Sequence, residues 1–143
     1  RIFLLDKKNR YVGAKIRTGS FTSTDIELQS VEMDGSLTQT PEFPYNWMYD
    51  GSRPQMPGFE MEITCKSLFL IFKDSGEMDV GKADVFVNDV YCMTADPHKN
   101  NWLHCNAVLL FWETESRSHK VRITVTEEDQ NKKFTILGFG YTI

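Results

Sequence analysis

Two segments of the chain combine flat aromatic rings with side chains that can hold the hydroxyl groups of a sugar. The first is PYNWMYDGSR, and its residues of interest are Tyr45, Trp47, Tyr49, Asp50 and Arg53. A sugar ring has apolar C–H faces that stack on aromatic rings, and hydroxyls that carboxylates, amides and arginine can hydrogen-bond. If residues 45–49 are extended, the three rings share one face, because residues two apart lie on the same side of a strand, and they could line one platform.

The second segment is DPHKNNWLHCN, in which Trp102 lies among the polar residues Asn101 and His104. Tryptophan is highly buried on average, so each tryptophan has a core position as its alternative. For Trp47 the platform and the core are equally consistent with the sequence, whereas the amides around Trp102 favour an exposed platform. Trp112 follows the apolar run VLLF and is expected in the core or at its edge.

Catalytic motifs are missing from the sequence. It contains no GxSxG, no GxxxxGK[ST] and no HExxH, which are the local patterns of hydrolases, nucleotide-binding proteins and metalloproteases. His119 begins a strand beside Lys120 and is expected at the surface, and Glu113 and Glu115 are expected in a polar turn. A triad assembled in space stays an alternative, but the sequence predicts a protein that is not an enzyme.

The bulk properties exclude several classes of protein. The net charge of −4 and the pI near 5.4 argue against nucleic-acid binding, which needs a basic surface. No apolar run approaches the ~18 residues that span a membrane, and no signal peptide is present. The length of 143 residues predicts one domain, 1–143, expected to be monomeric. The start at Arg1 suggests a mature or excised fragment.

The cysteines and histidines do not predict a metal centre. The sequence contains no CxxC or HxxxH spacing, so neither zinc nor another cofactor is expected. Cys65 and Cys92 lie in apolar alternation and are expected to be buried as small hydrophobic residues. A disulfide between Cys92 and Cys105 is the alternative.

Period-two alternation dominates after residue 57 and predicts strands. These strands are expected in GFEMEITC, SLFLIFKD, KADVFVND, VYCMTA, NAVLLFW, HKVRITVT and FTILGFGYTI. In the first half, RIFLL and AKIRTGSFT are expected to be strands, and DIELQSVEM is expected to be a strand with a short helix as the alternative. The proline- and glycine-rich residues 34–58 are expected to be mostly loop. The sequence therefore predicts an all-β fold, a two-sheet antiparallel β-sandwich of the jelly-roll type.

The second half of the chain resembles a known group of modules in its strand motifs. These are the segments Phe59 to Leu70, Gly81 to Asp89, Asn101–Trp102, His119 to Ile123 and Phe134 to Tyr141, with YNWMYDG upstream. Together they resemble the β-sandwich accessory modules attached to SGNH/GDSL-type esterases and other bacterial plant-polysaccharide-degrading enzymes. Two departures are Asp89–Val90, where a glycine is usual, and Cys105, where a small residue or proline is usual.

The resemblance implies a jelly-roll domain beside a catalytic partner, with a role in carbohydrate binding or in domain packing. Many such modules carry a structural calcium ion, for which Asp74, Glu77 and Asp79 are the candidate ligands. No compact DxDxDG pattern supports that ion, so a structural calcium is a minor alternative to a domain with no cofactor.

The expected function is therefore that of a non-catalytic carbohydrate-binding module. It would target an appended, secreted enzyme to plant cell-wall polysaccharide of the β-glucan or hemicellulose class. Trp47 and Trp102 would stack on sugar rings with help from Tyr45 and Tyr49, while hydroxyls would be held by Asp50, Arg53, Asn101 and His104. The alternative is a structural accessory domain that packs on a neighbouring SGNH esterase domain and binds no glycan.

Overall fold

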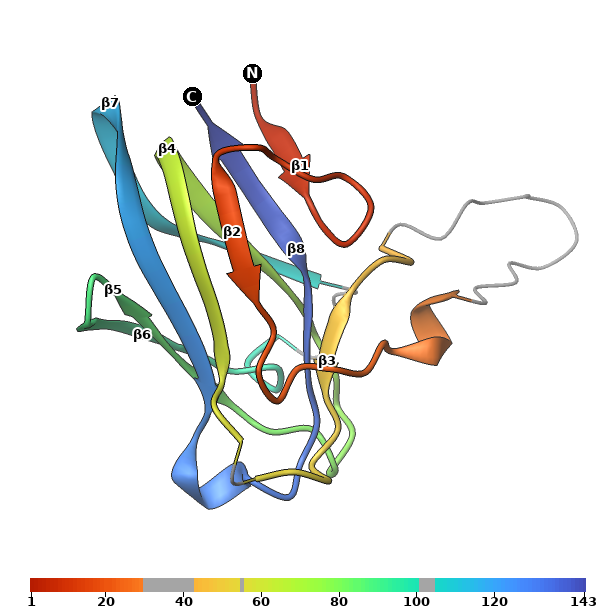
Figure 1. The fold of residues 1–143 in the computed structure, drawn as a ribbon. Helices are drawn as coiled ribbons and strands as arrows, with labels where there is room; N and C mark the ends of the chain where they lie inside the picture. The colour runs from red at the N-terminus through yellow and green to blue at the C-terminus, as the bar shows by residue number, and fades with distance from the viewer. Residues whose placement is uncertain (30–42, 55, 101–104) are drawn as a thin grey trace, which may run out of the picture.

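A computed structural model of the protein describes residues 1–29, 43–54, 56–100 and 105–143. These ranges contain eight strands and two short 3-10 helices, shown in Figure 1. The strands are β1 (Phe3–Leu5), β2 (Ala14–Arg17), β3 (Trp47–Tyr49), β4 (Phe59–Lys73), β5 (Ala83–Val87), β6 (Val90–Ala95), β7 (Cys105–Val125) and β8 (Phe134–Thr142), and the helices are η1 (Ile26–Gln29) and η2 (Glu127–Asp129). In the described part of the chain, no helix has the length and apolar character needed to cross a membrane.

The two longest strands, β4 and β7, organise the molecule. They pair antiparallel from Phe59 opposite Ile123 to Lys73 opposite Cys105, and they run side by side in Figure 1. The register shifts between Cys65 and Ser67 and again between Leu68 and Phe69, and such irregularities bend a strand so that it can serve two sheets.

Each half of β4 and β7 consequently belongs to a different layer. One layer contains β2, the first half of β4, the second half of β7, β5 and β6. The other contains β1, β3, β8, the second half of β4 and the first half of β7. All described pairings between strands are antiparallel, and the all-β sandwich predicted from the sequence is confirmed.

The strand boundaries differ from the prediction in β4 and β7. The two apolar runs expected as separate strands in each case form one continuous strand. Glu113 and Glu115 therefore lie within β7 and not in a turn. The intervening residues of β7 are largely exposed, and a strand whose side chains face water on both sides needs no apolar alternation.

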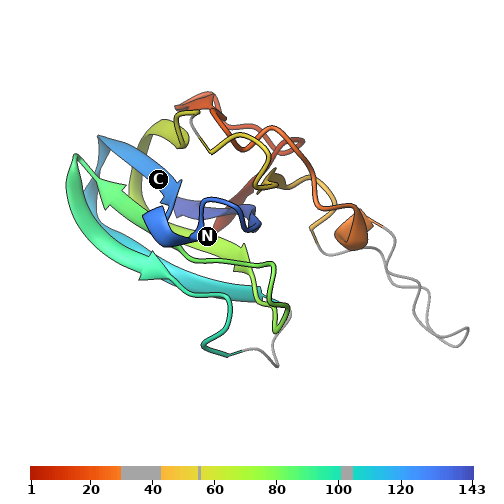
Figure 2. The ribbon, with the colours of Figure 1, turned by 90° about the horizontal axis from the view of Figure 1, so that it is seen from below.

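Two short elements differ from the main expectation, although a short helix was the alternative for the first of them. The segment from residue 25 was expected to be a strand, but residues 26–29 form η1, which lies beside β3 at the side of the molecule in Figures 1 and 2; residues 30–33 fall outside the described ranges. The Asp25 carboxylate accepts a hydrogen bond from the Glu27 N–H at 3.2 Å, a local bond that favours a turn over a strand. Strand β3 lies in the expected loop because its pairing with β8 is a tertiary contact.

The interior between the layers is rich in aromatic rings. The ring of Phe59 on β4 lies 5.2 Å from that of Trp47 and 5.7 Å from that of Phe139, measured between centroids. Cys65 is buried in this core as expected, whereas Cys92 is exposed and carries a free thiol, so the Cys92–Cys105 disulfide is not formed. Cys92 lies on β6, which ends the order of the sheet, so only one of its edges is paired.

Candidate functional site

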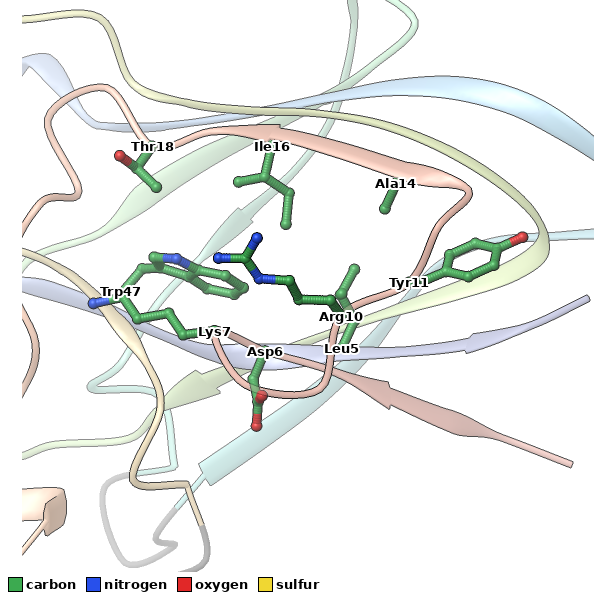
Figure 3. A pocket seen from close by; sticks show the side chains of 9 residues that line it. All are labelled: Leu5, Asp6, Lys7, Arg10, Tyr11, Ala14, Ile16, Thr18 and Trp47. Atoms are coloured by element: carbon green, nitrogen blue, oxygen red, sulfur yellow. The ribbon is translucent and has the colours of Figure 1, made fainter.

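The candidate site is a cavity between β1 and β2, where these two strands belong to opposite layers. It has a volume of about 440 Å³, which lies in the range of small-molecule sites. Its apolar lining comes from Leu5, Ala14, Ile16 and Trp47, and its polar lining from Asp6, Lys7, Arg10, Tyr11 and Thr18, as shown in Figure 3.

The turn after β1 positions the polar side chains of this cavity. The buried Asp6 carboxylate accepts hydrogen bonds from the backbone N–H groups of Lys8 at 2.8 Å and Asn9 at 2.6 Å. These bonds close a local turn of the kind that aspartate favours. Residues 7 and 10 are thereby carried to the mouth of the cavity, and Asp6 itself points away from its centre in Figure 3.

Lys7 and Arg10 give the cavity a positive character. The Lys7 Nζ donates to Thr24 Oγ1 at 2.6 Å and to the Ser23 carbonyl at 3.4 Å, and both of these acceptors are neutral oxygens. Burial lowers the pKa of Lys7 because desolvation disfavours the charged form. Arg10 is exposed, and its guanidinium points into the cavity toward Trp47 and Ile16 in Figure 3.

Trp47 forms part of the cavity wall and part of the core at once. The indole packs on Phe59 and Phe139 and is only 4% exposed. The expectation of an open, water-facing ring at Trp47 is therefore wrong. Pairing of β3 with β8 directs the Trp47 side chain into the sandwich. Only the edge of the indole that lines the cavity is available to a ligand.

Of the other two rings of the expected platform, Tyr49 is buried as Trp47 is, and only Tyr45 is exposed. Tyr49 is only 2% exposed, and its hydroxyl donates to the Gln130 carbonyl. Tyr45 is exposed and lies under the Lys8 ammonium, which is 5.1 Å from the ring centroid. Trp47 and Tyr49 do share one face as predicted, but that face is the inner one, because the segment is an inward-packed strand.

Asp50 and Arg53 do not line this cavity. The Asp50 carboxylate accepts hydrogen bonds from the hydroxyls of Ser23 and Ser52, both at 2.5 Å, and these bonds lower its pKa to about 2. Arg53 is exposed and its guanidinium lies 3.8 Å from the Met56 sulfur. Asp50 thus has a local structural role in holding the end of β3 to the segment around Ser23.

Asn101, Trp102 and His104 fall outside the described residues. Their expected role in a second aromatic platform stays a prediction.

The two described histidines each contact a neighbouring polar group. His98 Nε2 lies 2.6 Å from the Val80 carbonyl. His119, expected at the surface, is buried because its ring packs on Phe111. The Asn88 amide can only donate to His119 Nδ1, at 3.0 Å, so Nε2 carries the proton and faces Glu113 Oε1 at 2.5 Å.

Cys65 lies in the same interior, and burial followed by the charge of Glu113 raises the pKa of its thiol to about 11. A thiol with so high a pKa is almost entirely protonated at neutral pH and is a poor nucleophile.

The acidic residues considered for calcium do not form one site. Asp74 is buried and accepts a hydrogen bond from the Asn106 amide at 3.0 Å, while Asp79 pairs with Lys133 at 3.3 Å. Across the described residues, no group of three or more histidine, cysteine, aspartate or glutamate side chains is arranged to hold a metal ion.

Sequence reasoning identified Trp47 but missed the polar residues around it. Lys7, Arg10 and Thr18 come from the first 18 residues, whereas Trp47 lies after the expected loop. The turn signal Asp6 to Asn9 was the available hint, since such residues between two strands predict a tight connection. Nothing in the sequence shows that this connection lies against Trp47.

Comparison with known proteins gives a likeness in fold. No family model and no curated protein matches the sequence. A two-domain esterase active on acetylated mannans, crystallised with mannopentaose, is similar with a TM-score of 0.62 and 12% identity over 99% of this chain and 36% of that chain. A family two carbohydrate esterase from Cellvibrio japonicus has a TM-score of 0.52 and 14% identity over 99% of this chain and 33% of its own.

An acetyl xylan esterase from the rumen bacterium Butyrivibrio proteoclasticus has a TM-score of 0.52 and 13% identity, over 99% of this chain and 32% of its own. The chain thus spans about a third of the length of these solved structures. At such low identity the likeness shows the fold: that of a β domain within longer carbohydrate esterase chains.

Proposed function

We propose that the protein is a non-catalytic carbohydrate-binding domain that holds a linked, secreted esterase domain on plant cell-wall polysaccharide of the β-glucan or hemicellulose class. The observation that carries this proposal is the cavity of about 440 Å³ between β1 and β2. Its wall combines the indole of Trp47 with the hydrogen-bonding groups of Lys7, Arg10 and Thr18. An apolar ring surface with convergent polar groups is what the C–H face and the hydroxyls of a sugar require.

The similar solved structures support a link to a catalytic domain. They are carbohydrate esterases, and this chain covers about a third of each. The engaged histidines and the high thiol pKa of Cys65 support placing catalysis in the linked domain. Binding by one cavity would be modest, and the tether would then raise the effective concentration of the enzyme at its substrate.

The test is affinity electrophoresis of the chain through gels that contain soluble mannan, xylan, β-glucan or pectin. We expect retardation in at least one gel and its loss in Thr18→Val and Lys7→Met. Lys15→Met is the matched control, because Lys15 lies on the same strand as Ile16 but outside this cavity. Unretarded migration of the folded wild type in every gel would refute the proposal.

A second candidate function is domain packing, and the outer side of the β1–β8–β4–β7 layer favours it. We define the outer face by Ile2, Leu4, Phe69, Leu109 and Trp112. The pairings place Leu4, Gly140, Phe69 and Leu109 in one cross-strand row, and Thr142, Ser67 and Trp112 in a neighbouring one. These rows contain no charged residue, and Leu109 and Trp112 are 47% and 79% exposed.

Exposed apolar patches of this kind mark interaction surfaces. A linked esterase domain seated on the outer face would give the protein a structural role, with or without a bound glycan. If the outer face is such an interface, the isolated domain is expected to self-associate through it. A carbohydrate-binding domain that does not pack on the esterase domain is expected to be monomeric.

Sedimentation velocity over a wide concentration range separates the two outcomes. Self-association that Trp112→Lys abolishes, and that the control Val12→Lys preserves, would support the packing role. Val12 is fully exposed and lies in the turn before β2. A wild type that stays monomeric throughout would remove the support for this candidate.

A further inference from the structure

Arg10 differs from the other arginines of the chain in having no partner among the described residues. It makes no ion pair, side-chain hydrogen bond or ring contact within residues 1–29, 43–54, 56–100 and 105–143. The contacts of the other five are Arg17 with Glu60, Arg117 with Glu113, Arg1 over Phe3, Arg122 over Phe86, and Arg53 beside Met56.

The carboxylate nearest in sequence does not supply the missing counter-ion. Asp6 Oδ1 accepts from the backbone N–H groups of Lys8 and Asn9, and the Asn9 amide donates to both carboxylate oxygens at 3.2 and 3.1 Å. Its hydrogen-bonding capacity is used within the turn. Asp6 keeps its negative charge, but its carboxylate points away from the centre of the cavity, whereas the Arg10 guanidinium points into it (Figure 3).

Lys7 adds a second cation that lacks an acidic partner. Its ammonium is half-buried and donates to two neutral oxygens of Ser23 and Thr24. Burying a charge without an opposite charge is unfavourable, and the lowered pKa of Lys7 reflects that cost. A ligand that brought a negative charge to the cavity would offset it.

We propose that the cavity binds an acidic sugar, namely a uronic acid unit of a polysaccharide, with its carboxylate held by Arg10 and Lys7 and its ring against Trp47. This inference rests on the proposed function and names the ligand class of the same site. The guanidinium is planar and matches a carboxylate through two parallel hydrogen bonds, while the ammonium acts as a point charge. Thr18 remains to hydrogen-bond a ring hydroxyl.

The shape of the Arg10 group favours a carboxylate over a sulfate or phosphate ester on the sugar. A planar carboxylate lies flat against the planar guanidinium, whereas sulfate and phosphate esters are tetrahedral. Four of the nine lining residues are apolar, namely Leu5, Ala14, Ile16 and Trp47, and they suit the uncharged ring of the sugar. Sulfated glycans are retained as one arm of the test.

The experiment is isothermal titration of the chain with glucuronoxylan oligosaccharides and with the same oligosaccharides after carboxyl reduction. We expect the reduced ligand to bind at least about tenfold more weakly, since carboxyl reduction removes the charge-assisted hydrogen bonds to Arg10 and Lys7. Arg10→Gln should weaken binding of the acidic ligand by a similar factor and binding of the reduced ligand, which loses only a neutral hydrogen bond, by a much smaller one. Arg10→Lys should recover part of the lost affinity for the acidic ligand. Added salt should weaken binding of the acidic ligand and not that of the reduced one.

Arg17→Gln is the matched control, because Arg17 is an exposed arginine on β2 whose partner is Glu60. Equal affinity for the acidic and reduced oligosaccharides would overturn the inference and leave the proposed carbohydrate-binding function standing. Tighter binding of a sulfated oligosaccharide than of the uronate would also overturn it. A folded chain that binds none of these oligosaccharides would overturn the inference, and unretarded migration in all four polysaccharide gels would in addition refute the proposed function.

Discussion

Trp47 and Trp112 occupy opposite environments, and the difference runs against the local sequence around each. Trp47 stands among tyrosines, an asparagine and an aspartate, yet it is 4% exposed and packs on Phe59 and Phe139. Trp112 ends the apolar run VLLFW, yet it is 79% exposed on the outer face. Local polarity therefore predicted neither environment.

The reason lies in which sides of a strand the fold covers. β3 is a short strand on β8 whose inward residues close the core, so its aromatic residues are buried despite polar neighbours. β7 is apolar on both parities between residues 108 and 112, but only its inner side faces the other layer. Such a run is typical of a strand covered on both sides. In this structure the outer side of β7 is uncovered, and Leu109 and Trp112 are exposed there.

The largest expected effect distinguishes the two tryptophans by stability. Trp47→Ala should reduce the free energy of unfolding by about 3–5 kcal/mol, because it removes a buried ring and leaves a cavity. Trp112→Ala should change it by less than about 0.5 kcal/mol, as for other surface substitutions. Urea denaturation followed by circular dichroism measures both. Equal losses in the two variants would contradict the assigned environments.

Two glycines of β8 that lie against β1 give a second, smaller effect. A methyl group added at Gly138 would lie 2.9 Å from the Leu5 carbonyl oxygen, which is backbone and cannot give way easily. Gly138→Ala should therefore cost about 1–3 kcal/mol of unfolding free energy. At Gly140 the nearest atom is the Ile2 Cγ2 at 3.1 Å, so Gly140→Ala should cost less than about 1 kcal/mol. Thermal unfolding of the two variants measures both losses. A larger loss in Gly140→Ala than in Gly138→Ala would show that β1 is placed differently.

Asp50 offers a pH-dependent test of how the segment after Trp47 is anchored. Its pKa is lowered from 3.8 to about 2 by hydrogen bonds from Ser23 and Ser52. A carboxylate with a lowered folded-state pKa stabilises the protein above its unfolded pKa, and the contribution is lost as the pH falls through about 2. Asp50→Asn should cost about 1–2 kcal/mol at neutral pH after allowance for partial exposure, and almost nothing near pH 2.

Asp89→Asn is the control for that measurement, since Asp89 is an exposed residue 3.4 Å from Lys120. Its effect should be small at every pH. A penalty for Asp50→Asn that persists unchanged between neutral pH and pH 2 would contradict the assigned role.

The smallest effect compares Tyr45 with Trp47, two residues along the chain. The Lys8 ammonium over the exposed Tyr45 ring should contribute about 0.5 kcal/mol, as is usual for cation–π contacts in water. Lys8→Gln and Tyr45→Ala should each lose about that amount in chemical denaturation. In the double variant the two losses should not add, and strictly additive losses would show that the contact contributes nothing.

The sequence predicted the fold more reliably than the site. Alternation in GFEMEITC and HKVRITVT indicated strands correctly, because one side of each faces a core and the other faces water. The cavity could not be found in this way. Lys7, Arg10 and Trp47 approach one another only because β1 and β2 join opposite layers while β3 pairs with β8.

The order of residues by itself determined most of the strand content and the inward faces of β5 and of the first half of β4, since period-two patterns depend on nearest neighbours along the chain. Tertiary structure alone decided which tryptophan is buried and which cations stand without an acidic partner. Those properties depend on side chains from distant segments, such as Phe59 against Trp47 and the turn at Asp6 beside Arg10. Burial and pairing arise only when the two layers close on each other.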